Sequence, residues 1–135
     1  MPIADSVVTV ATLKEIVVDC RDAPTLARFW AEVLDEYDIA PYDATEIERL
    51  ASLGLTPETD PTVGLLGPGP EIFFQQVPEQ KLTKNRLHLD VVSAHRGAEV
   101  DRLLALGASV YAVYDGRTVL LDPEGNEFCV VDPAP

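Results

Sequence analysis

The stretch Asp122-Pro123-Glu124-Gly125-Asn126-Glu127-Phe128-Cys129-Val130-Val131 decides how the rest of the chain is interpreted. Pro123 fixes one backbone angle and Gly125 permits a positive one, so the pattern predicts a chain reversal. The residues after the turn alternate as in a strand, with Glu127 and Cys129 on a polar face and bulky apolar residues on the other. We therefore expect a strand that turns one face to the core and offers a thiol on the opposite face.

The length and the charge of the chain exclude several classes of protein. A chain of 135 residues is long enough for one domain with a real core, and we expect a single domain over residues 1–135. The net charge of −13 makes nucleic acids and anionic membrane surfaces unexpected partners. No run of about 18 apolar residues predicts a membrane span. Residues 1–11 have no basic region before an apolar one, so we expect no secretory signal.

The two cysteines, Cys20 and Cys129, do not form a disulfide scaffold pattern. Neither belongs to a Cys-x-x-Cys pair, and this usage favours a reducing, cytoplasmic setting. Each thiol has a simple interpretation as a small buried apolar residue. For Cys129 a role on a site-bearing face is an equal alternative.

Hydrophobic periodicity predicts a strand, two helices and two further strands in the first half of the chain. A strand is expected over residues 13–19, and Asp22 is placed to cap the helix that follows. Apolar residues then recur at helical spacing: Leu26, Phe29, Trp30, Val33 and Leu34. A short helix is expected over 44–55, and a hairpin is expected from strands over 62–66 and 71–77.

The second half shows the same order of elements. A strand is expected over 86–92, a helix with Leu103 in its stripe is expected to end near Gly107, and a hairpin is expected around Asp115-Gly116. The strand after Gly125 closes the series. The chain therefore looks like one unit used twice, with modules at about 10–80 and 84–133. In the first module a helix stands where a second strand would be expected.

Four stretches carry a resemblance to a known family: VDCRDAPTLARFW (18–30), FQQVP (74–78), KNRLHLD (84–90) and DPEGNEFCV (122–130). They resemble the glyoxalase-like branch of the vicinal-oxygen-chelate superfamily, which includes glyoxalases, bleomycin-resistance proteins and extradiol dioxygenases. The resemblance covers nearly the whole chain and implies an α+β fold. Two βαβββ modules would form a curved mixed β-sheet cup with helices on the outside, and the protein would be a homodimer.

The resemblance also implies where a divalent metal would bind. The matching positions are Glu15, His88 and Cys129, with a second ligand position near Gln75 or Gln76. Strand parity agrees, because Glu15, His88 and Cys129 all lie opposite apolar faces. Glu15 and His88 suit zinc, nickel, iron or manganese. Relatives commonly carry Glu where this chain has Cys129, so no cofactor is certain from the pattern. His88 is also interpretable as a polar cavity-wall residue bonded to neighbours such as Glu15.

A small organic molecule is the expected ligand of such a cup, and Arg86, His88, Gln75 and Cys129 are the candidate binding residues. Lys81, Lys84 and Arg86 gather within six residues of an acidic chain. They predict either a solvated loop or an anchor for a carboxylate or phosphate, since an Arg fork matches such oxygens. Arg86 shares strand parity with His88.

Three functions remain open from the sequence. The first is a binding or sequestering protein without a catalytic metal, in the manner of bleomycin-resistance relatives. The second is a metal-dependent lyase, isomerase or dioxygenase of the glyoxalase type. The third is an interaction module with a closed core and no ligand. The sequence does not decide between an enzyme and a binding protein.

Overall fold

The computed structural model describes residues 10–135. The expectation about residues 1–11 therefore lies almost entirely outside the described residues. Within 10–135 no helix is long and apolar enough to cross a membrane. The helices and strands follow one another as β1 (Glu15–Cys20), α1 (Ala23–Val33), β2 (Asp38–Ile39), α2 (Ala44–Ser52), β3 (Thr62–Leu66), β4 (Glu71–Gln76), β5 (Leu89–Val92), α3 (Arg96–Ala105), β6 (Ser109–Tyr114), β7 (Arg117–Leu121) and β8 (Glu127–Val131).

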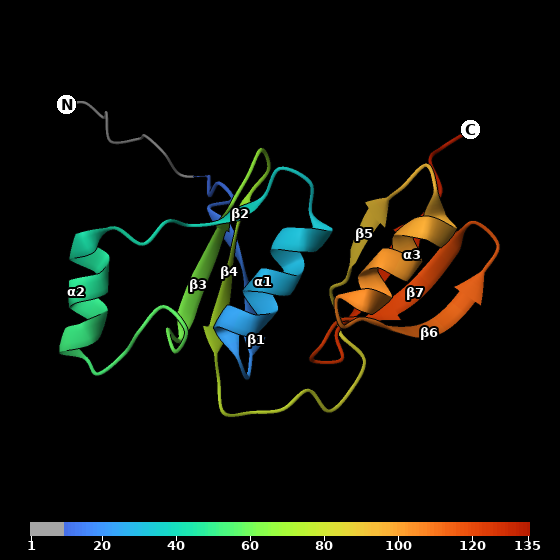
Figure 1. The fold of residues 1–135 in the computed structure, drawn as a ribbon. Helices are drawn as coiled ribbons and strands as arrows, with labels where there is room; N and C mark the ends of the chain where they lie inside the picture. Colours follow the sequence, from blue (N-terminus) through green and yellow to red (C-terminus); the bar gives the residue numbers. More distant parts are fainter. Residues whose placement is uncertain (1–9) are drawn as a thin grey trace.

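The two halves of the described chain share one topology, as the repeated pattern predicts. Module one (residues 15–76) forms a sheet in the order β1-β4-β3-β2, and module two (residues 89–131) forms a sheet in the order β5-β8-β7-β6. In each module the first strand pairs in parallel with the last, and the other pairs are antiparallel. The α+β class and the duplicated βαβββ order are confirmed. The two sheets remain separate and do not close on each other (Figure 1).

Helix α1 begins where the sequence predicts. Asp22 is its N-cap, and the Asp22 carboxylate accepts hydrogen bonds from the backbone N–H of Thr25 at 3.2 Å and from the Thr25 hydroxyl at 2.9 Å. Pro24 lies in the first turn, where its missing N–H leaves no helix bond unmade. The predicted apolar stripe is buried along the helix, except that Leu34 is the C-cap.

The core of module one continues into module two through aromatic rings. Phe29 and Trp30 of α1 reach Phe128 of β8, with ring centroids 6.1 Å and 4.8 Å apart, respectively, in edge-on arrangements. Phe128 is fully buried, and its face of β8 is the apolar face that the alternation predicts. Aromatic pairs of this kind add about 0.5–1.5 kcal/mol beyond the area they bury. The two modules therefore share one core across their junction.

The turn at residues 122–126 ties the modules together by hydrogen bonds. The buried Asp122 carboxylate accepts from the Trp30 indole N–H at 3.0 Å. The Glu124 carboxylate accepts from the backbone N–H groups of Arg21 at 2.7 Å and Asp22 at 2.9 Å, just before α1. The turn that the sequence predicts as a chain reversal is therefore also the main polar contact between the two halves.

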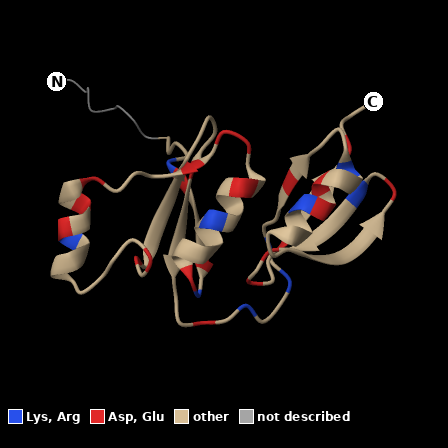
Figure 2. Ribbon diagram, viewed as in Figure 1, with Lys and Arg blue, Asp and Glu red and all other residues tan. Residues whose placement is uncertain are grey.

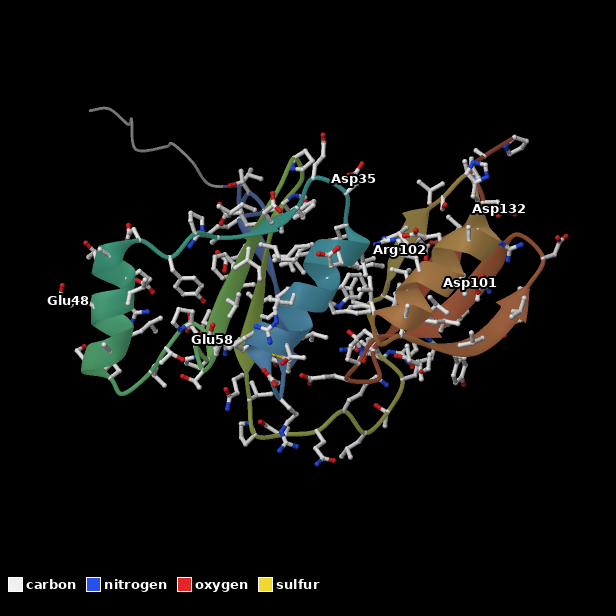
Figure 3. The ribbon with its side chains drawn as sticks, in the orientation of Figure 1. Asp35, Glu48, Glu58, Asp101, Arg102 and Asp132 are labelled. Atoms are coloured by element: carbon white, nitrogen blue, oxygen red, sulfur yellow. The ribbon has the colours of Figure 1, made fainter. Side chains whose placement is uncertain are left out.

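A second tie joins the two long helices. Arg102 of α3 donates to the backbone carbonyl of Glu32 in α1 at 2.9 Å, while it also pairs with Glu99 on its own helix at 2.7 Å. Figure 3 shows the labelled Arg102 side chain in the space between α1 and α3. The ion pair with Glu99 fixes the Arg102 guanidinium in place, so its N–H group is already oriented for the hydrogen bond to α1.

The structure corrects three details of the predicted elements. A short strand, β2, does form between α1 and α2, because its two residues pair with β3; two residues carry no readable periodicity. Helix α2 ends at Ser52, before the expected end at residue 55, and Leu50 is the one residue that it buries. Strand β5 starts at Leu89 instead of residue 86, because its pairing with β8 begins at Phe128.

Candidate ligand-binding site

A cavity of about 290 Å³ lies between the two modules. It opens along β1, the edge strand of sheet one, and along residues 85–89, which lead into β5, the edge strand of sheet two. Its wall is largely apolar and comes from both modules: Ile16, Val18, Trp30, Ile72, Phe74 and Leu89. Its size is at the low end of the range for small-molecule sites, which are about 300–1,000 Å³.

The strand pattern explains why this space is apolar. Ile16 and Val18 lie on the face of β1 that turns toward the core, and each is only partly buried because no strand borders β1 on its outer side. Leu89 begins β5 with the same orientation toward the core. Two half-covered edge strands therefore leave an apolar gap where the modules meet.

Polar groups also line the cavity. Asp19, Asn85, Arg86, His88, Asn126 and Glu127 line it. They come from the end of β1, from the connection between β4 and β5, and from the turn before β8. Figure 1 shows that connection passing beneath both modules, and Figure 2 shows basic segments along it. The site thus combines a largely apolar lining with a few polar groups, as small-molecule sites typically do.

Two of the carboxylates on the wall already have partners. Asp122 accepts from Trp30 and also from the Glu124 backbone N–H at 2.9 Å and from the Asn126 side-chain amide at 2.9 Å. Glu127 pairs with Lys81 at 3.3 Å. These bonds hold the two acids in place and occupy their oxygens.

The environment of Glu127 shifts its acidity. Burial alone raises the pKa of Glu127, but hydrogen bonds from its own backbone N–H and from that of Asn85, together with Lys81, outweigh burial and hold the pKa below its ordinary value. Glu127 is therefore ionised at neutral pH and serves to fasten the β4–β5 connection onto β8. Asn85, Arg86 and His88 of this connection line the cavity, so this bond helps to shape the site.

Arg86 is the one basic side chain, apart from His88, that lines the cavity in the described part of the chain. Among residues 10–135 it makes no hydrogen bond or ion pair, unlike Lys81. Arg86 also lies ahead of β5, so the expected strand parity with His88 does not apply. Its position at the cavity comes from the connection instead.

A second group of side chains lies at β5 and β8, with Asp90 and Cys129 on the face of sheet two that points away from the core. His88, Asp90 and Cys129 each offer a ligand atom, and these atoms lie within 4.8 Å of one another. The His88 Nε2 and Asp90 Oδ1 atoms are 3.4 Å apart. Asp90 and Cys129 are direct partners in the parallel β5–β8 pair, so the register brings their side chains together.

Cys129 is buried although it lies on the face away from the helices. Burial raises the pKa of the Cys129 thiol, and the nearby Asp90 carboxylate raises it further. The residue is therefore a neutral thiol at neutral pH unless a cation replaces its proton. Histidine nitrogen, carboxylate oxygen and thiolate sulfur are the donors that zinc accepts, so this set fits a zinc ion.

The predicted site residues do not all meet. His88 borders both the cavity and the metal-type group, whereas Arg86 borders only the cavity and Cys129 only the group. Glu15 pairs with Lys14 at 3.4 Å and lies in neither. Gln75 lies beside Asp19 in the β1–β4 register, and it also lies in neither. Its side chain and that of Gln76 are exposed.

The neighbour of His88 in the structure differs from the one expected from the sequence. His88 lies near Asp90, whereas the interpretation as a wall residue paired it with Glu15. Asp90 was not singled out from the sequence. Asp90 lies two residues after His88, on the same face of the strand expected over 86–92. Parallel pairing of that strand with the strand at 127–131 would place Asp90 beside Cys129. Trp30 was expected in the core only, yet it also borders the cavity.

Comparison with known proteins gives one family and many similar folds. A family model described as a glyoxalase-like domain matches residues 15–131. No curated protein matches the chain. Among solved structures, the fosfomycin resistance protein FosX from Mesorhizobium loti is 14% identical, with a TM-score of 0.65 over 93% of this chain and 94% of that one.

Two further structures have the same fold at low identity. A glyoxalase/bleomycin resistance protein/dioxygenase family enzyme from Burkholderia phytofirmans is 21% identical, with a TM-score of 0.61 over 90% of this chain and 98% of that one. The oxidase ChaP-H2 is 16% identical, with a TM-score of 0.59 over 94% of this chain and 96% of that one. The three names differ in activity, so the likeness extends to the fold alone.

Proposed function

Because the chain belongs to the glyoxalase-like family of the vicinal-oxygen-chelate superfamily, we propose that it binds a small organic ligand in the cavity between its two modules. The observation that carries this proposal is the combination of apolar lining from Ile16, Val18 and Leu89 with the polar lining residues Arg86 and His88. A closed interaction module would pack such a gap with side chains. A ligand would supply the missing apolar contacts and place its polar group against the polar lining residues.

Trp30 makes this proposal directly testable. It is the only tryptophan in the chain, and it borders the cavity. Ligand entry is therefore expected to change the intrinsic fluorescence, and a library of small aromatic and aliphatic compounds is the probe. Hits are also expected to raise the melting temperature, because binding to the native state alone stabilises it.

A cavity-filling variant supplies the decisive comparison. Val18→Phe places a ring in the cavity and is expected to abolish the fluorescence response while the circular dichroism spectrum and a cooperative melt persist. Val113→Phe is the matched control, because Val113 is 69% exposed on β6 and does not line the cavity. Unchanged binding by Val18→Phe, with Val113→Phe behaving alike, contradicts the proposed site.

A second candidate function is metal-dependent chemistry, and the group of His88, Asp90 and Cys129 favours it. In this reading these three residues hold a zinc ion, which would supply a Lewis acid to polarise a substrate carbonyl. His88 then links the ion to the cavity, because it borders both. The activity would be that of a lyase, isomerase or dioxygenase.

Elemental analysis of protein purified without chelator or added metal tests the second candidate. About one zinc per chain is expected, falling to background in Cys129→Ser and in Asp90→Asn. His95→Ala is the matched control, since His95 is the only other histidine and lies outside the group. Wild-type protein without metal, which also fails to take up added zinc, rules this candidate out.

Two further expectations accompany the proposal. A homodimer is in keeping with the family. A cytoplasmic location is in keeping with two cysteines that are both free and buried. Sedimentation of the purified chain at working concentration tests the dimer, and a monomer mass would refute it.

A further inference from the structure

The charges around the cavity point to one class of ligand. Resting on the proposed function, we propose that the cavity is selective for a monocarboxylate with a compact apolar body, and that Arg86 receives the carboxylate. The sequence leaves a carboxylate and a phosphate equally open as partners of the basic cluster. The arrangement of partners in the structure separates them.

The basic cluster does not act as a unit. Lys81 is held by Glu127 at 3.3 Å and by the carbonyl oxygen of Thr83 at 2.6 Å, and it does not line the cavity. Lys84 also lies outside the cavity lining. Arg86 alone faces the cavity, and within residues 10–135 it has no hydrogen-bond or ion-pair partner. One available guanidinium therefore marks the anion position.

Arginine is suited to this task by its shape. Its planar fork binds a carboxylate through two parallel N–H···O bonds, which fixes orientation as well as charge. The side chain is exposed, so a free anion in water would gain little from it. The apolar wall adds the remaining affinity by taking up the body of the ligand. Selectivity thus requires both parts at once.

The acids at the same cavity exclude more highly charged ligands. Asp19, Asp122 and Glu127 line it together with Arg86, and the chain as a whole carries −13. The hydrogen bonds that the Glu127 carboxylate accepts hold its pKa below the ordinary value, so Glu127 is ionised at neutral pH. Within residues 10–135 only Glu127 of the three acids has a lysine partner, so a phosphate dianion would be repelled more strongly than a monocarboxylate, whose single charge matches the one guanidinium in the lining.

The volume sets the size of the ligand body. At about 290 Å³ the cavity is small for an organic ligand site. Its apolar lining includes Ile16, Val18, Ile72, Leu89 and Trp30. A single ring or a short aliphatic chain fits this description.

Matched acids and amides test the assignment. The probes are benzoate against benzamide, hexanoate against hexanamide, and phenyl phosphate, each followed by Trp30 fluorescence and by calorimetry. The acids are expected to bind at least tenfold more tightly than their amides and than phenyl phosphate. In Arg86→Gln this preference is expected to vanish, with amide binding retained, and Arg86→Lys is expected to restore part of it. Lys84→Gln is the matched control and is expected to keep the full preference.

The outcomes separate this inference from the function on which it rests. If acids and amides bind equally well and Arg86→Gln changes neither, the carboxylate assignment is overturned while ligand binding stands. Tighter binding of phenyl phosphate than of benzoate also overturns it. If no probe binds by either method, both the assignment and the cavity as a ligand site are refuted. Circular dichroism of Arg86→Gln confirms that the variant is folded.

Discussion

Replacing Asp122 is expected to weaken the junction between the two modules more than any exposed acidic substitution. The Asp122 carboxylate is only 4% exposed and accepts from Trp30 Nε1 at 3.0 Å, from the Glu124 and Asn126 backbone N–H groups at 2.9 Å each, and from the Asn126 amide. Each buried donor left unpaired costs about 1–3 kcal/mol. Water can reach part of the turn, so Asp122→Ala is expected to cost about 3–4 kcal/mol of unfolding free energy.

A double-mutant cycle isolates the bond across the modules. Trp30→Phe removes the indole N–H but keeps a ring against Phe128, and the double variant with Asp122→Ala completes the cycle. A hydrogen bond to a charged group contributes about 1.5–3 kcal/mol, and this is the expected coupling energy. Urea unfolding followed by far-ultraviolet circular dichroism gives the four free energies, since fluorescence is lost with Trp30.

An exposed acidic residue, Asp132, provides the control for Asp122→Ala. Asp132 pairs with Arg96 at 2.9 Å and is 47% exposed, so Asp132→Ala is expected to cost at most about 1 kcal/mol. If Asp122→Ala costs no more than Asp132→Ala, or if the coupling energy is below about 0.5 kcal/mol, the turn does not fasten the modules. The reasoning from its hydrogen bonds would then be wrong.

Three other predictions follow from single contacts. Gly67→Ala is expected to cost about 1–3 kcal/mol in urea unfolding, because its new Cβ would lie 2.5 Å from the ring of Tyr37. The pKa of Glu127 is lower in the folded state than its ordinary value, so ionised Glu127 stabilises the folded wild type, and this stabilisation is lost as the pH falls from about 4.5 through the folded-state pKa. Glu127→Gln is therefore expected to lack this part of the acid-induced decrease in unfolding free energy. Burial, with Glu124 as a further cause, raises the pKa of the Cys20 thiol to about 12. In the variant Cys129→Ser, Cys20 is the remaining thiol. It is expected to react with Ellman's reagent at pH 8 about a thousandfold more slowly in the folded state than in the unfolded state.

Each of these has an outcome that contradicts it. Gly97→Ala serves as the control for Gly67, because no atom lies within 4 Å of its added Cβ and alanine favours α3; equal losses for the two variants would refute the steric argument. If the unfolding free energies of wild type and Glu127→Gln fall in parallel as the pH is lowered, Glu127 does not contribute to the loss of stability in acid. Rapid labelling of Cys20 in the folded state would show that the thiol is accessible and ionised.

The order of elements was predictable because most of them carry strong local signals. The Asp22 cap, the stripe around Phe29 and the turn at Gly125 each follow from residue chemistry within a few positions. Gly125 does adopt a positive φ of 86°. Strand β2 escaped prediction because two residues have no period, and the start of β5 escaped it because only pairing with β8 defines that strand.

The site was less predictable than the fold because it depends on contacts between distant segments. Parity placed His88 and Cys129 on the same face, and the structure brings them together. Glu15 obeyed the same parity but lies on a different sheet, and periodicity does not report how two sheets are oriented. The cavity depends on the gap between edge strands, which no local pattern encodes.

The position of β8 in its sheet has a consequence for how the protein is made. The order β5-β8-β7-β6 means that, among the strands of residues 10–135, only β8 pairs with β5, and β8 also borders β7. Until residues 127–131 leave the ribosome, β5 has no neighbour in its sheet and Phe128 is missing from the shared core. More than thirty residues separate the end of β5 at Val92 from the start of β8 at Glu127, and while they are synthesised module two is incomplete and its apolar surface is exposed. The same stretch that reveals the fold in the sequence is the one that permits it to form.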